Sequence, residues 1–142
     1  MDRYGSAHTT RYDALLMQVR TDKNLPGFFD LLFVPGDGSW KHDRNNQQVD
    51  YAVRFSLELF EFMWIIFTEL NLVLPEKRSH PSARGWCLMF AEWSKIDVVR
   101  EGWLRYRLTF SQRFRNFVES PAIGLPQVKP DSAPQETKTR GT

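Results

Sequence analysis

The stretch FSLELFEFMWIIFTEL, residues 55–70, is the most apolar part of the chain and decides how the sequence folds. A transmembrane helix needs about 20 consecutive apolar residues, whereas glutamates at positions 58, 61 and 69 interrupt these sixteen. An acidic side chain in the middle of a bilayer costs about 2.5–3.5 kcal/mol. We therefore expect a helix of the protein core, without a transmembrane segment.

The same stretch belongs to a longer helix, predicted over residues 47–74. On this helix Arg54, Glu58 and Glu61 fall on one stripe, which continues to Thr68 or Glu69 with Ile65 as its apolar exception. Almost all other positions are apolar, and such a helix is surrounded by other helices. The stripe is then its solvent edge, with Arg54 and Glu58 forming an i,i+4 ion pair.

Shorter helices are predicted around this one. A first helix begins at Thr9 or Thr10, a short helix or turn follows Pro26, and a surface loop covers residues 34–48. Pro75 ends the long helix and residues 75–85 form a loop. A tryptophan-bearing helix then starts near Ser82, Asp97 caps a separate segment that Gly102 weakens, and Ser111 caps the last helix. The apolar faces of the first and last helices comprise Tyr12, Leu15, Leu16 and Val19, and Phe114, Phe117 and Val118.

The C-terminal segment, residues 120–142, has a different composition. It contains four prolines, no aromatic residue and few large apolar ones. Such a segment buries too little to offset its ordering entropy, so a disordered Pro-rich tail is predicted. The domain is then residues 9–119, an all-α, compact bundle of four to five helices around one long central helix.

Composition limits the functional classes. The chain has 142 residues, which suits one domain, and a hydrophobic fraction of 42% with eleven Phe and five Trp. The 19 basic and 17 acidic residues nearly cancel, so no field of one sign demands a nucleic-acid partner. Cys87 is the only cysteine, so no internal disulfide can form. Together with an N-terminus that lacks a signal-peptide pattern, this favours a cytoplasmic location.

No catalytic, cofactor or metal site is predicted. The three histidines are far apart, and the sequence has no HExxH, CxxC or ExxH motif to match the ExxE of Glu58 and Glu61. Cys87 is interpreted as a small buried hydrophobe, the alternative being a thiolate activated by Arg84 and the helix start near Ser82. The GDG of residues 36–38 lacks the rest of a phosphate-binding loop and is interpreted as a turn.

Residues 100–115 are the one segment whose side chains suit the binding of a ligand. Aromatic residues Trp103, Tyr106, Phe110 and Phe114 alternate with arginines that form a possible face for an anionic partner: Arg100, Arg105, Arg107, Arg113 and Arg115. Arginine among aromatics is used to bind single-stranded nucleic acid and phosphate. The alternative is a solvated basic face that Glu92, Glu101 and Glu119 partly neutralise.

The sequences LELFEFMWIIFTELNLVLPE (57–76) and GWLRYRLTFSQRFRNFVES (102–120), with a tryptophan-bearing helix between them, carry a family resemblance. The matching positions are Trp103, Arg107, Ser111, Phe114, Arg115, Phe117 and Val118. Over residues 22–119 the chain resembles small bacterial all-helical domains of unknown function, some of which follow an N-terminal membrane anchor. The resemblance implies a helical fold and no activity. The loop PGDGSWKHDRNN and the Pro-rich tail depart from the family pattern.

Three hypotheses about function are compatible with the sequence. The first is a non-enzymatic cytoplasmic protein-interaction module, because the aromatic surplus exceeds what a small core is expected to hide and leaves a patch for a protein partner or self-association. The second is peripheral binding of nucleic acid or an anionic membrane surface through the arginines of residues 100–115. The third is an enzyme with an unrecognised small-molecule site.

Overall fold

The computed structural model describes residues 6–33, 39–41 and 44–128. Within these residues the chain forms six α-helices, two short 3-10 helices and no strand, which confirms the all-α prediction. In chain order they are α1 (Ser6–Thr21), α2 (Phe28–Phe33), α3 (Asn46–Glu69), η2 (Pro75–Ser79), α4 (Pro81–Trp93), α5 (Asp97–Tyr106), η3 (Arg107–Thr109) and α6 (Gln112–Val118). None of the helices in this part of the chain is both long enough and apolar enough to span a bilayer.

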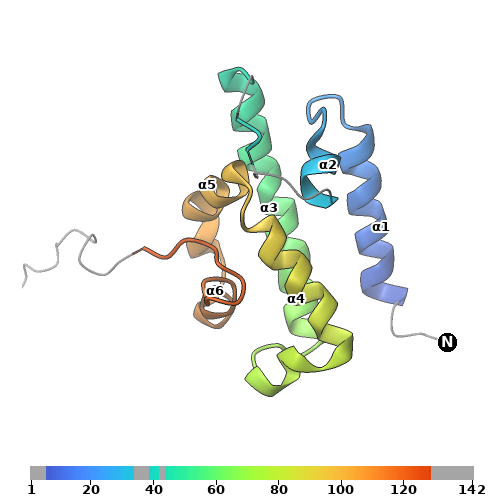
Figure 1. Cartoon of the computed structure of the whole chain (residues 1–142), viewed down its shortest axis with the longest axis vertical. Coiled ribbons are helices and arrows are strands. Elements are labelled where there is room, and N and C mark those ends of the chain that lie inside the picture. The colour runs from blue at the N-terminus through green and yellow to red at the C-terminus, as the bar shows by residue number, and fades with distance from the viewer. Residues whose placement is uncertain (1–5, 34–38, 42–43, 129–142) are drawn as a thin grey trace, which may run out of the picture.

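Helix α3 is the centre of the bundle. It runs between α1 and α2 on one side and α5 and α6 on the other, with α4 alongside it (Figure 1). Ten of its residues are buried, among them Phe60, Met63 and Ile66. Each large apolar side chain that is removed from water in this way contributes about 1.5–3 kcal/mol. Burial around most of its circumference is what the composition of residues 55–70 predicts.

The ends of α3 are fixed by local hydrogen bonds. At its start Asn45 and Gln48 form a capping box, each side chain accepting from the other's backbone N–H at 2.8 and 3.1 Å. At its end Asn71 adopts a left-handed conformation, with φ 57°. The N–H groups of Asn71 and Leu72 donate to Thr68 and Phe67, the two bonds of a Schellman motif.

The predicted end of this helix at residue 74 is therefore wrong, because the Schellman motif ends α3 at Glu69, before Pro75 is reached. The predicted loop over residues 75–85 is also wrong. Pro75 begins η2, and Pro81 begins α4, whose N-cap His80 accepts a hydrogen bond from the Ser82 N–H. In both places proline stands at a first helical position, where its missing N–H is not needed.

The solvent edge of α3 is confirmed in outline. Arg54, Glu58 and Glu61 are exposed, and Ile65 is half-buried. Arg54 does not pair with Glu58 as predicted: its Nε lies 3.0 Å from the Asp50 carboxylate, one turn in the opposite direction.

Helix α5 packs on α3 and also holds the chain that precedes α3. The Asp97 carboxylate, at the first turn of α5, accepts hydrogen bonds from the Trp40 N–H at 2.9 Å and the Lys41 N–H at 3.1 Å. Trp40 is 2% exposed and meets Phe28 edge-to-face. The predicted surface loop of residues 34–48 is thus corrected at Trp40, which belongs to the core, while residues 34–38 and 42–43 lie outside the described residues. Gly102 does not interrupt α5, which continues to Tyr106.

The chain beyond α6 remains packed against the bundle for several residues. Ile123 and Leu125 are buried, and the Leu125 N–H donates to the Val118 carbonyl at 2.9 Å. Arg100 donates to the Gly124 carbonyl at 2.9 Å. The ordered domain therefore extends past the predicted boundary at residue 119, at least to residue 125. The rest of the predicted tail, residues 129–142, lies outside the described part of the chain.

Candidate functional site

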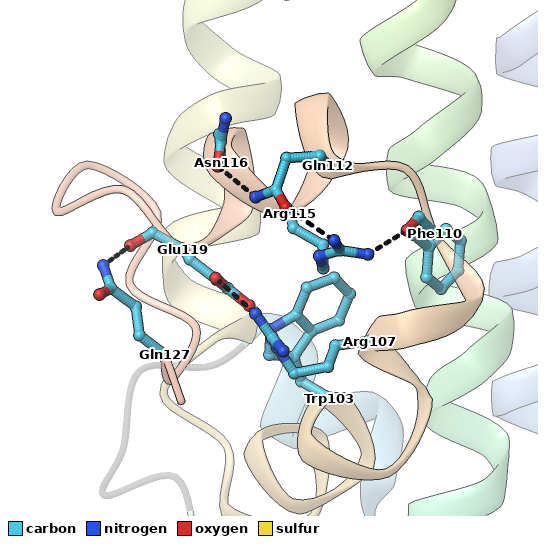
Figure 2. Close-up of polar contacts among 8 residues, drawn as sticks. All are labelled: Trp103, Arg107, Phe110, Gln112, Arg115, Asn116, Glu119 and Gln127. Carbon is cyan, nitrogen blue, oxygen red and sulfur yellow. Dashed lines mark hydrogen bonds and ion pairs between the residues drawn. The ribbon is translucent and has the colours of Figure 1, made fainter. Parts of the chain in front are cut away.

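Arg107 and Glu119 form the most buried ion pair among the described residues. Arg107 donates from Nε at 2.7 Å and from a terminal nitrogen at 3.1 Å, with side chains that are 16% and 9% exposed. The Trp103 indole N–H donates to the same carboxylate at 2.7 Å, as Figure 2 shows. Glu119 therefore joins α5 and η3 to the end of α6, and this arginine is held inside the fold.

Of the other four arginines in residues 100–115, three also donate hydrogen bonds within the chain. Arg115 donates to the Phe110 carbonyl and the Gln112 side chain (Figure 2), Arg100 to two backbone carbonyls, and Arg105 to Asp50. Only Arg113, of these five, is exposed with no bonding partner in the described part of the chain.

The aromatic residues between them give no stacking platform. Trp103 and Phe114 are fully buried, and Tyr106 and Phe110 are half-buried. Single-stranded nucleic acid is bound by stacking bases on exposed rings, whereas Trp103 and Phe114 pack against Phe60 and Phe67 of α3 and only part of Tyr106 and Phe110 is exposed. The expected neutralisation by Glu119 is found at Arg107, whereas Glu101 pairs with Lys41 and Glu92 with Lys95. The anionic-partner face stays a prediction, with Arg113 as its one unengaged member.

Cys87 lies on α4 and is half-buried. Burial raises the pKa of its thiol, and the positive charge of Arg78 offsets this only in part. The thiolate form is thus disfavoured, which is the opposite of what a nucleophile requires. In the described ranges, no three His, Cys, Asp or Glu side chains are grouped so that they could hold a metal ion.

Most of the Phe and Trp side chains lie in the core. All eleven phenylalanines are buried or half-buried, and Trp40, Trp93 and Trp103 are fully covered. Trp64 differs, because 43% of it is exposed on α3. The expectation that α3 is covered everywhere except at its charged stripe is therefore wrong at Trp64, which lies three residues after Glu61 and so shares the edge of that stripe.

Trp64 lies in a hollow of about 420 Å³. Its floor is Glu61, Trp64 and Ile65 of α3, one wall is Arg11 of α1, and the other wall is the segment Thr109, Phe110 and Ser111. Leu108, the residue before this second wall, is 76% exposed. The hollow thus combines an indole ring and apolar side chains with one basic and one acidic group.

Two further hollows continue along α3 from the first. The next, of about 180 Å³, shares Arg11 with it and reaches Gln18 and Glu58. The last, of about 260 Å³, shares Gln18 and Glu58 and ends at Tyr51, Arg54 and Phe55. We call these three hollows together the α3 groove. From Tyr51 to Ile65 it spans about 21 Å at 1.5 Å per residue.

The groove has the chemistry of a binding surface. Its floor is the stripe of α3 that the sequence identifies as a solvent edge, and α1 supplies one wall throughout. Two of its hydroxyl groups serve the fold: Ser111 accepts the Phe114 N–H at the start of α6, and Tyr51 donates to Asp22, which raises the Tyr51 pKa. The charged pair at its Tyr51 end, Arg54 and Asp50, is exposed.

Comparison of the chain with protein-family models, with curated proteins and with solved structures finds no match. The resemblance to small bacterial helical domains therefore stays a prediction, resting on Trp103, Arg107 and the helix that Ser111 caps. The function has to be inferred from the geometry of the α3 groove itself.

Proposed function

We propose that this protein is a non-enzymatic interaction module that receives a helix of a protein partner in the α3 groove. The observation that carries the proposal is the exposure of Trp64 inside a hollow, in a bundle where every phenylalanine is at least half-covered. Exposed tryptophan and arginine are the side chains on which binding energy concentrates in protein interfaces.

The dimensions of the groove support a helical partner. A length of about 21 Å accommodates roughly 14 residues of helix. An amphipathic helix lays anchors at every third or fourth position into such a groove. Trp64 and Ile65 offer apolar contact at one end of the groove, and Glu61, Glu58 and Arg54 offer charged contacts along the rest of its length.

We further propose that the module works in the cytoplasm. The support is compositional: the single cysteine cannot form an internal disulfide, and proteins of oxidising compartments commonly rely on disulfides when they are small.

The alternative proposal is binding of nucleic acid or an anionic membrane surface through Arg100, Arg105, Arg107, Arg113 and Arg115. Its support is weaker, since four of these side chains donate hydrogen bonds within the chain. An enzymatic function has no described group of converging catalytic side chains to support it.

The test is affinity capture with a matched pair of variants. Trp64→Glu places a charge in the groove, and Leu88→Glu places one on α4, at a side chain that is 66% exposed and outside the groove. We expect a retained protein that survives nuclease and high salt, is lost with Trp64→Glu and is kept with Leu88→Glu. Equal retention by all three proteins would overturn the proposal. Retention that disappears with nuclease or salt would support the arginine alternative.

A further inference from the structure

We draw no further inference here: the strongest candidate, the hollow around Trp64 between α1 and the segment 109–111, belongs to the α3 groove already described, and nothing in the structure shows which partner or ligand covers it.

Discussion

Gly102 of α5 lies against Ser56 of α3 so closely that a Cβ atom added to Gly102 would be 1.8 Å from Ser56 Oγ. The Val53 carbonyl oxygen would be 2.9 Å away. Both glycine and serine are fully buried, and the Ser56 hydroxyl donates to that same carbonyl. The absence of a side chain at position 102 is thus what allows the backbones of α3 and α5 to approach each other.

Replacing Gly102 by alanine should lower the free energy of unfolding by about 1–3 kcal/mol, since extra volume in a packed interface forces the helices apart. Alanine elsewhere in a helix gains about 0.5–1 kcal/mol over glycine, so the sign of the effect identifies the contact. Gly85→Ala on α4 is the control, because no atom lies within 4 Å of a Cβ added there. Chemical denaturation should show the two variants moving in opposite directions; a Gly102→Ala protein as stable as the wild type would contradict the packing.

Glu119→Gln should destabilise the protein by about 2–3 kcal/mol, because Arg107 loses its charged acceptor while it remains largely covered. The matched change is Glu92→Gln, which breaks an exposed pair with Lys95 and should cost less than about 1 kcal/mol. Thermal or urea unfolding of the two variants compares them directly. Equal small losses would mean that the Arg107–Glu119 pair contributes no more than a surface ion pair.

Leu125→Ala should lower stability by about 2–4 kcal/mol, because the side chain is 2% exposed and its removal leaves a cavity. Val128→Ala, three residues later, changes a side chain that is 47% exposed and should be neutral within about 0.5 kcal/mol. If both variants unfold like the wild type, the chain after α6 does not belong to the cooperative domain.

Cys87 should react slowly with iodoacetamide at neutral pH. Burial raises its pKa above that of an ordinary thiol, so the thiolate, which is the reactive form, is depleted at any pH below that raised value. The rate in the folded protein should be lower than in the urea-unfolded chain, and its rise with pH should be displaced toward alkaline values. A folded-state rate that exceeds the unfolded rate would indicate an activated thiol and reopen the nucleophile hypothesis.

The long apolar helix and the Ser111 cap could be predicted because they depend on neighbouring residues. The predicted caps at Thr9 or Thr10 and at Asp97 are wrong, because α1 already includes Ser6 and Asp97 is the first residue of α5, after the N-cap Ile96. The pattern of residues 55–70 requires burial on most sides, and Ser111 provides a side-chain acceptor for the Phe114 N–H from three positions away. The missed end of α3 was also local: Asn71 is the residue type that enters the left-handed conformation most readily after glycine. Proline at position 75 was simply the more conspicuous signal.

The interpretation of residues 100–115 shows where sequence reasoning stops. A segment of arginines and aromatic residues looks the same in the sequence whether its arginines bind a phosphate or join two helices. Arg107 meets Glu119, and Arg105 meets Asp50 from another helix altogether. Those pairings depend on how α3, α5 and α6 are arranged, because contacts between elements are not encoded by spacing along one of them.

The sequence by itself determined that this protein is a helical domain built on one central helix, since hydrophobic periodicity and capping act over a few residues. Only the tertiary structure decided which side chains remain exposed. It brought α1 and the segment 109–111 to the two sides of one exposed stripe and left Trp64 between them. Such a groove is made by three segments distant in the chain, and its existence depends on their packing.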